Sequence, residues 1–219
     1  MQPRYLAFSL SALLTALVAI NPAYSAAPTE AASCLACHGA QGEGLAAAGY
    51  PRLAGLSAPY LTDQLNAYIA GRRVNAIMSG MAKPLTAAQI QVIASYFSTL
   101  TPPVNPALPI TNLAQAELGQ QLALRGDWTA GIPACFSCHA ADGAGVSPAF
   151  PPLIGQPAAY IEAQIKAWKD GTRQAEPQNL ANALMHNVAL RMSDAQSQAV
   201  AAWLSSLPAA YATLGQAKP

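Results

Sequence analysis

The sequence Cys34-Leu35-Ala36-Cys37-His38 returns 101 residues later as Cys135-Phe136-Ser137-Cys138-His139. The pattern Cys-x-x-Cys-His is the attachment sequence of c-type haem. Two thiols with this spacing bond the two vinyl groups of the porphyrin, and the adjacent histidine binds the iron as an axial ligand. The two motifs use all four cysteines of the chain, which leaves none for a disulfide. The sequence therefore predicts two covalently bound haem c groups.

Two other chemistries also use Cys-x-x-Cys pairs. A redox dithiol of the thioredoxin type requires a βαβ setting and no histidine, and a zinc site can draw its four ligands from two such pairs. The histidine after each second cysteine favours haem over both alternatives. An internal repeat, which puts each pair in a separate copy, also argues against shared zinc.

The repeat covers much more than the two motifs. The segment Tyr50-Pro51-Arg52-Leu53 recurs as Phe150-Pro151-Pro152-Leu153, at an offset of 100 residues. Gly55, Tyr60, Gln64, Gly71 and Arg73 recur as Gly155, Tyr160, Gln164, Gly171 and Arg173. Beyond this point the offset is 107, because the second copy has seven more residues between Gly171 and Met185. Such self-similarity indicates two copies of one structural unit.

The periodicity within each copy is helical. Apolar residues at helical spacing are Leu61, Leu65 and Ile69 in the first copy and Ile161, Ile165 and Trp168 in the second. Thr86 with Gln89, and Ser193 with Gln196, have the spacing of capping boxes at the start of a last helix. We therefore predict an all-α fold of two tandem domains.

The two copies differ before their motifs. A helix is predicted over about Leu113 to Arg125 in the second copy. In the first copy only about eight residues lie between the end of a predicted export signal, at residue 25, and the motif. We therefore expect the first domain to be less stable than the second.

The N-terminus has the features of a secretory signal. Leu6 to Ile20 is apolar, Arg4 is the single charge before Glu30, and small residues at Ala23 and Ser25 suit a signal peptidase. We predict a signal peptide over 1–25 and a periplasmic location, with an uncleaved membrane anchor as the alternative. Four prolines between Thr101 and Pro109 predict a stiff linker over 102–110, between domains at 26–101 and 111–219.

Composition and charge exclude several classes of protein. Eleven Lys and Arg balance ten Asp and Glu, for a formal net charge of +1. A nucleic-acid-binding protein usually carries a strong basic excess, so no nucleic-acid partner is expected. Hydrophobic residues make up 53% of the chain, which excludes a disordered protein. The apolar N-terminal run has no counterpart elsewhere in the chain, which excludes a polytopic membrane protein and leaves at most a loose association with the membrane surface.

Each copy offers one methionine at the same place in the repeat. Met78 and Met185 both lie seven residues before the first apolar position of the last helix, on a segment that we expect to be a loop crossing the haem. Met81 and Met192 are competitors, but neither is matched in the other copy. His186, beside Met185, is a further candidate, which we expect instead to face solvent near the haem edge. Methionine–histidine ligation raises the reduction potential and fills both axial positions, as in a one-electron carrier.

Other matched residues are candidates for the surroundings of the haems. An iron-binding histidine usually donates its second N–H to a carbonyl, which Pro51 and Pro151 can supply. Candidates to hold the haem propionates are Arg52, Arg73, Arg173, Tyr60 and Tyr160. Each of these is also explained by an ordinary surface arginine or core tyrosine.

These residues together resemble the dihaem cytochrome c4 family. The resemblance rests on both Cys-x-x-Cys-His motifs, Pro51 to Gly55, Tyr60 to Leu65, the methionine segment and Tyr96-Phe97, and it covers about residues 30 to 210. It implies two class I cytochrome c domains related by pseudo-twofold symmetry, with iron ligands His38 and Met78, and His139 and Met185. It also implies electron delivery to a terminal oxidase in the periplasm. The truncated first helix and the short segment from Gly71 to Met78 are more like the cytochrome subunits of periplasmic dehydrogenases, such as flavocytochrome c sulfide dehydrogenase.

Three functions remain open at this point. The first is a periplasmic electron-transfer protein that donates to a terminal oxidase, with a quinol–cytochrome c oxidoreductase or a periplasmic dehydrogenase as its other redox partner. The second is the electron-accepting subunit of one dehydrogenase. The third is a dihaem peroxidase, which would need one haem with an open ligand position. A methionine in both copies argues against the third.

Overall fold

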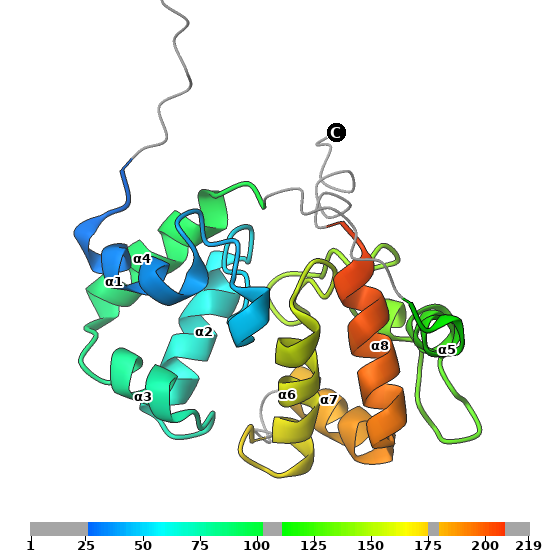
Figure 1. Ribbon diagram of the computed structural model, residues 1–219. Helices are drawn as coiled ribbons and strands as arrows, with labels where there is room; N and C mark the ends of the chain where they lie inside the picture. The colour runs from blue at the N-terminus through cyan, green and yellow to red at the C-terminus, as the bar shows by residue number, and fades with distance from the viewer. Residues whose placement is uncertain (1–25, 103–110, 175–179, 209–219) are drawn as a thin grey trace, which may run out of the picture.

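The computed structural model describes residues 26–102, 111–174 and 180–208, and these form two helical domains (Figure 1). The first domain contains α1 (Thr29–His38), a 3-10 turn at Ala46–Ala48, α2 (Ala58–Ile69), α3 (Ala76–Ala82) and α4 (Ala87–Thr99). The second contains α5 (Leu113–Leu124), a 3-10 turn at Cys135–Ser137, α6 (Ala158–Lys169), α7 (Leu180–Arg191) and α8 (Asp194–Ser206). Extended pairing in the described residues is limited to isolated β-bridges, so the all-α prediction is confirmed.

Several predicted segments lie wholly or partly outside the described residues. These are the signal segment at 1–25, positions 103–110 of the linker and positions 175–179 of the seven-residue insertion. The helix predicted before the second motif is confirmed as α5.

The last helix of each domain begins at the predicted capping box. Thr86 Oγ1 accepts from the backbone N–H of Gln89 at 3.3 Å, and Gln89 Oε1 accepts from the N–H of Thr86 at 2.9 Å. Ser193 and Gln196 make the same two bonds at 3.1 and 2.9 Å. Each box satisfies backbone donors that the first helical turn leaves unpaired, which fixes where α4 and α8 begin.

The cores of the two domains differ in size. In the second domain α5 packs across α8, and its Leu122 and Ala123 are fully buried. An ideal Cβ on Gly119 would lie 2.2 Å from the carbonyl oxygen of Ala199, so the absence of a side chain lets the two helices approach closely. In the first domain α1 packs on α4 near the fully buried Ala31 and Phe97.

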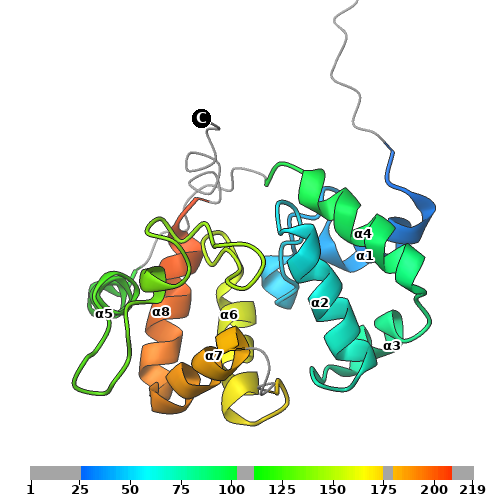
Figure 2. The same cartoon turned by 180° about the vertical axis from the view of Figure 1, so that it is seen from behind.

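The domains lie side by side with α2 and α6 on their inner sides, as both views show (Figures 1 and 2). Equivalent residues of the repeat meet there, since Arg73 and Arg173 form an antiparallel β-bridge. On either side of this bridge Val74 N–H donates to Thr172 O at 2.7 Å, and Gln174 N–H donates to Arg72 O at 2.8 Å. Two domains related by a pseudo-twofold axis bring a residue against its own repeat partner only at that axis, so the Arg73–Arg173 bridge lies there.

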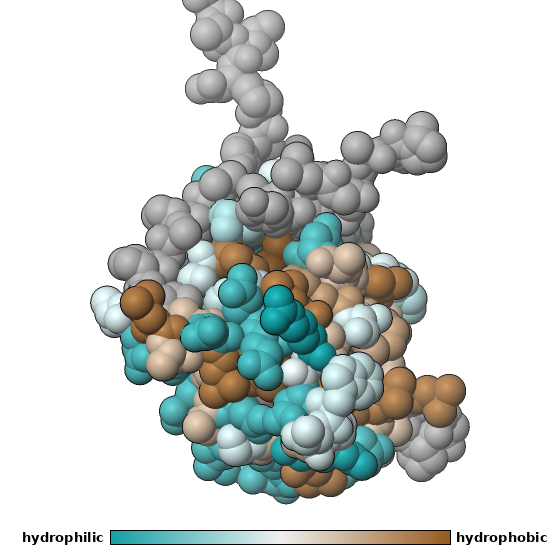
Figure 3. Space-filling model, turned by 90° about the vertical axis from the view of Figure 1, so that its right-hand side faces the viewer, coloured by the Kyte–Doolittle hydropathy of each residue, from teal (hydrophilic) through white to brown (hydrophobic). Residues whose placement is uncertain are grey.

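The outer face of the second domain carries apolar residues in several separate groups among polar ones (Figure 3). In the described part of the chain no helix combines the length and the apolar character that a membrane crossing needs.

Candidate haem sites

The two motif histidines have the same geometry in both domains. His38 Nδ1 lies 2.8 Å from the carbonyl oxygen of Pro51, and His139 Nδ1 lies 2.7 Å from that of Pro151. This confirms the carbonyl acceptors predicted from the repeat. A carbonyl only accepts, so Nδ1 carries the proton and Nε2 keeps a lone pair for a metal.

A tight turn brings each proline carbonyl to its histidine. Gly44 N–H donates to His38 O at 2.7 Å, and Gly145 N–H donates to His139 O at 2.9 Å. Both glycines have left-handed backbones, with φ of +84° and +82°. An ideal Cβ would lie 2.7 Å from Arg52 N in the first turn and 2.5 Å from Pro152 N in the second. Glycine is therefore needed at both positions, for conformation and for space.

Burial tunes the ionisation of the motif side chains. It lowers the pKa of His38 and of His139, an effect that the proline carbonyls partly offset. Both imidazoles are therefore neutral at pH 7, the form that binds iron. Burial raises the pKa of Cys34, and it raises the pKa of Cys135 to about 11. A redox dithiol needs a lowered thiol pKa, so these values argue against thioredoxin-type chemistry.

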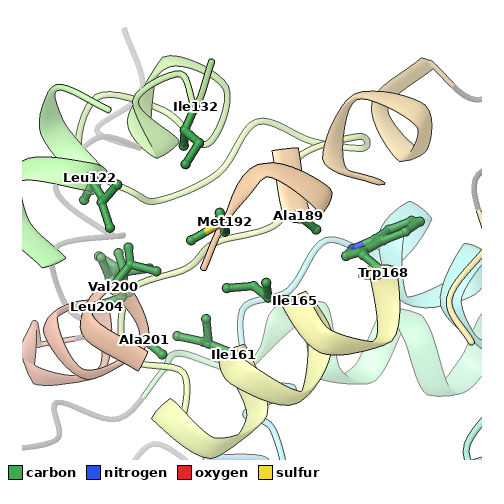
Figure 4. Packing of buried hydrophobic residues seen from close by; sticks show 12 residues of the cluster. Leu122, Ile132, Ile161, Ile165, Trp168, Ala189, Met192, Val200, Ala201 and Leu204 are labelled. Atoms are coloured by element: carbon green, nitrogen blue, oxygen red, sulfur yellow. The ribbon is translucent and has the colours of Figure 1, made fainter. Parts of the chain in front are cut away.

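A cavity of about 660 Å³ lies against the motif of the second domain, and residues of the first domain form part of its wall. Cys135, Cys138, His139 and Met185 all line it. Figure 4 shows Ile165, Met192 and Val200, which line the same cavity, around one central space. The volume lies within the range of about 300–1,000 Å³ typical of ligand and cofactor sites. Apolar walls, two thiols, a neutral histidine and a thioether fit a haem.

The first domain presents the same residue types on different elements. Cys34 and Cys37 are half-buried on α1, while His38 ends this helix and is 5% exposed. Met78 is half-buried on α3. The ring centres of Tyr50 and His38 lie 6.2 Å apart, and those of Phe150 and His139 lie 5.9 Å apart. The aromatic neighbour of the histidine is therefore also repeated.

Both predicted methionine ligands lie on helices, so the expectation of a loop is wrong. Asn75 caps α3, and its Oδ1 accepts from the backbone N–H of Met78 at 2.9 Å. Met185 lies in the middle of α7. In the first domain the cap favours the helix, because it satisfies a backbone donor that the first helical turn leaves unpaired.

His186 is placed differently from the expectation that it faces solvent. The residue is half-buried, and its Nδ1 lies 2.9 Å from the carbonyl oxygen of Trp168. Met185 lines the cavity of the second domain and His186 does not. Adjacent residues on a helix point about 100° apart, so His186 lies on a different side of α7 from Met185.

Six polar residues of the repeat gather between the domains. Gln64 Oε1 accepts from Arg73 Nη1 at 2.8 Å and from Arg173 Nη2 at 3.0 Å. Gln164 Oε1 accepts from Arg73 Nη2 at 2.6 Å and from Arg173 Nη1 at 3.1 Å. Tyr160 and Tyr60 complete the cluster: Arg73 Nη2 donates to the Tyr160 hydroxyl at 3.0 Å, and Arg173 Nη2 to that of Tyr60 at 3.4 Å.

Arg52 lies in another part of the interface. It is not repeated, because the second copy has Pro152 at the equivalent position. It is fully buried, its guanidinium donates to Ala54 O and to Ile154 O, and burial lowers its pKa to about 10. The side chain of Gln156, from the second domain, makes two hydrogen bonds with the backbone of Arg52. Arg52 N–H donates to Gln156 Oε1 and Gln156 Nε2 donates to Arg52 O, both at 3.0 Å. Arg52 does not line the second-domain cavity.

The sequence alone indicates no role for Gln64, Gln164 or Gln156. The first two carried a usable signal, because they recur at the same offset as the arginines that they bind. Gln156 carried none, since its repeat partner is Leu56.

The two cysteine pairs lie in different domains, which is not the arrangement of a four-cysteine zinc site. Within 26–102, 111–174 and 180–208, no three His, Cys, Asp or Glu side chains group in a way that would hold a metal ion.

Comparisons with known proteins agree with this geometry. The family model described as cytochrome c matches residues 26–101 and 116–208. The chain is 60% identical over 198 residues to the thiosulfate dehydrogenase electron acceptor of Thiomonas intermedia (strain K12), which covers 90% of this chain and 89% of that protein.

Two solved structures are similar over 81% of this chain. Reduced recombinant cytochrome c4 from Pseudomonas stutzeri superposes with a TM-score of 0.71 at 33% identity, and 95% of that chain is covered. The thiosulfate dehydrogenase TsdBA from Marichromatium purpuratum gives a TM-score of 0.72 at 39% identity, but the match spans only 37% of that chain.

Both halves of the chain therefore have the cytochrome c fold, and each has a complete attachment motif. The protein is an electron carrier with two covalently bound haem c groups, and its partners are redox proteins. The chain belongs to the cytochrome c family, and within it to the dihaem cytochrome c4 family.

Proposed function

We propose that this protein is the electron-accepting cytochrome subunit of a periplasmic thiosulfate dehydrogenase. The observation that carries the proposal is the 60% identity to a thiosulfate dehydrogenase electron acceptor across nearly the full length of both chains. Identity to the cytochrome c4 structure is lower, at 33%. The match to part of the TsdBA chain also supports the proposal, since a unit of this kind then occurs within a thiosulfate dehydrogenase.

The arrangement of two haem sites suits this role. A dehydrogenase withdraws electrons in pairs, whereas a haem takes up one electron at a time. A carrier with two sites in contact through one interface accepts both electrons in a single docking event. A haem held in this apolar cavity with a methionine as its second ligand would favour the ferrous state and would therefore accept electrons from the donor.

We propose the following attachment and ligand sets. Cys34 and Cys37 hold the first haem, with His38 and Met78 as its iron ligands. Cys135 and Cys138 hold the second, with His139 and Met185 as its ligands. With both a histidine and a methionine bound, the iron would have no position open to small substrates, which favours electron transfer over peroxidase chemistry. Export by the segment 1–25 would place it in the periplasm, where c-type haem is attached.

Direct delivery to a terminal oxidase becomes the later step of this proposal. The carrier must return to the oxidised state, and a high-potential oxidant such as a terminal oxidase is suited to that reaction.

Stopped-flow mixing with thiosulfate dehydrogenase and thiosulfate tests the proposal. We expect rapid growth of the ferrous haem absorption bands with two electrons taken up per chain. Thiosulfate without the dehydrogenase should give no rapid reduction. Reduction no faster than that of an unrelated single-haem cytochrome c would contradict the proposal.

A further inference from the structure

The cluster between the domains contains two buried cations with neutral partners. Arg73 is 6% exposed and Arg173 is 9% exposed. In the described ranges their hydrogen-bond acceptors are glutamine and tyrosine oxygens, and neither guanidinium makes an ion pair with a carboxylate. Buried charges are normally paired with an opposite charge, because burial removes them from water. The cluster therefore favours an anionic group next to it.

The cavity of the second domain reaches this cluster. Arg173 lines the cavity, and so do Tyr60 and Gln64 from α2 of the first domain. A haem carries two propionate carboxylates at one edge, and these are the anions that a haem in this cavity would bring. The residues of the first domain thus form part of the wall around the second haem.

We propose that Gln64 and Tyr60 of the first domain are positioning residues for the haem of the second domain. Gln64 Oε1 and the Tyr60 hydroxyl both accept from Arg173 Nη2, at 3.0 and 3.4 Å. They hold the guanidinium at the cavity wall, where its positive charge favours the ferrous state of the second haem. The reduction potential of that haem therefore depends on the neighbouring domain.

The repeat supplies a check on this proposal within the molecule. Gln164 and Tyr160 of the second domain hold Arg73 of the first, at 2.6 and 3.0 Å. Each arginine is therefore held by both domains, because Gln64 also accepts from Arg73 at 2.8 Å and Gln164 from Arg173 at 3.1 Å. Each arginine also stacks on an aromatic ring of its own domain. The Cζ atom of Arg73 lies 4.7 Å from the centre of the Tyr68 ring, and the Cζ atom of Arg173 lies 4.7 Å from the centre of the Trp168 ring.

The inference rests on the haem assignments under the proposed function, but not on the dehydrogenase as partner. The test therefore uses the isolated, fully haem-loaded protein. A redox titration followed by NMR of the haem methyl groups gives the potential of each haem separately. A failure of docking to the dehydrogenase would leave this result unchanged.

The Gln64→Leu variant removes the acceptor and keeps similar bulk. We expect the equilibrium constant for reducing the second haem to fall about tenfold, which equals about 59 mV for one electron. Gln64→Glu should lower it further, because a carboxylate neutralises Arg173 while preserving the size and the acceptor. Tyr60→Phe, which removes the longer bond, should lower it about threefold.

Two variants of the first domain serve as controls. Gln91→Glu adds the same charge on the exposed side of α4, and Tyr96→Phe removes a hydroxyl away from the interface. Both should leave the second haem within twofold of the parent protein. An unchanged second-haem potential in Gln64→Glu with two haems bound would overturn the proposal, as would a fall confined to the first haem.

Discussion

The two domains reach the same histidine geometry from different backbone structures. In the first, the attachment motif completes a regular helix, α1. In the second, it begins in a 3-10 turn that is separated from α5 by a loop. The distances from Nδ1 to the proline carbonyl nevertheless agree, at 2.8 and 2.7 Å. The glycine turn and the proline, which both copies share, therefore set the orientation of the ligand, and the preceding helix does not.

The preceding helix instead determines how much core each domain has. Among the described residues, twelve buried hydrophobic side chains form the main cluster of the second domain, against seven in the first. The difference comes partly from α5, whose Leu122 and Ala123 have no counterpart ahead of the first motif. We therefore retain the expectation that the first domain is the less stable, since buried apolar area is the main source of stability.

The largest effect expected is the loss of an axial methionine, which should be alike in the two domains. Met185→Ala should open the second haem to carbon monoxide and lower its potential by on the order of 100 mV, within the range of about 0.8 V that axial ligands span. Met78→Ala should do the same to the first haem. Carbon monoxide difference spectra and redox titration measure both.

The neighbouring His186 gives the control for this prediction. His186→Ala should leave the spectrum of the second haem intact, because its Nδ1 is hydrogen-bonded to Trp168 O and the residue does not line the cavity. If His186→Ala opened the iron while Met185→Ala was silent, the ligand assignment would be wrong.

The second prediction concerns the close crossing of α5 and α8 at Gly119 in the second domain. Gly119→Ala should destabilise the second domain by about 1–3 kcal/mol, because the new Cβ meets the backbone of Ala199 and the helices must separate. Gly80→Ala in α3 is the matched change, since no atom lies within 4 Å of an ideal Cβ there. It should stabilise α3 by about 0.5–1 kcal/mol. Thermal unfolding followed by circular dichroism separates the two outcomes, and equal effects would refute the close crossing.

Much of this architecture follows from sequence because its signals are local. Cys-x-x-Cys-His, the two capping boxes and the apolar positions of α2 and α6 all act within a few residues of one another. The acceptor carbonyls of Pro51 and Pro151 were also predictable, since the repeat marked them in both copies.

The features that the sequence did not reveal depend on contacts with the other domain, on a single helix-capping residue, or on the tertiary position of a helix. The hydrogen bonds between Gln156 and Arg52 join residues 104 positions apart. The repeat does not contain a second such pair, so no sequence pattern indicates them. In the first domain the methionine segment is a short helix that begins at the Asn75 cap, and the sequence analysis did not weigh this single capping residue. The hydrogen bond that turns His186 away from solvent needs the end of α6, whose position only the tertiary structure provides.

A smaller effect is expected where the motifs themselves differ. Gly39 follows His38 with φ of +86°, and Ala140 takes this place after His139 with φ of +67°. A left-handed backbone costs an alanine about 1–2 kcal/mol relative to glycine. Ala140→Gly should therefore stabilise the second domain by about 1 kcal/mol, after allowance for the greater freedom of glycine in the unfolded chain. Chemical denaturation of the two proteins measures the difference, and a loss of stability would contradict the strain assigned to Ala140.

The smallest effect expected is that of salt on electron transfer, and it follows from a property that the domains share. Residues 26–101 contain four positive and three negative side chains, and residues 111–219 contain six positive and seven negative, so the formal charges are +1 and −1. The four haem propionates add a modest negative charge, part of which lies beside Arg73 and Arg173 in the proposed arrangement. Electrostatic steering needs a strong field of one sign, which neither domain has.

Between low and physiological ionic strength, where the screening length shortens to about 8 Å, the second-order rate constant with the dehydrogenase should change less than about threefold. Stopped-flow rates over a salt series provide the measurement. A steep fall would mean that one domain docks through a local charged patch, and charge-reversal variants of each domain would then show which one.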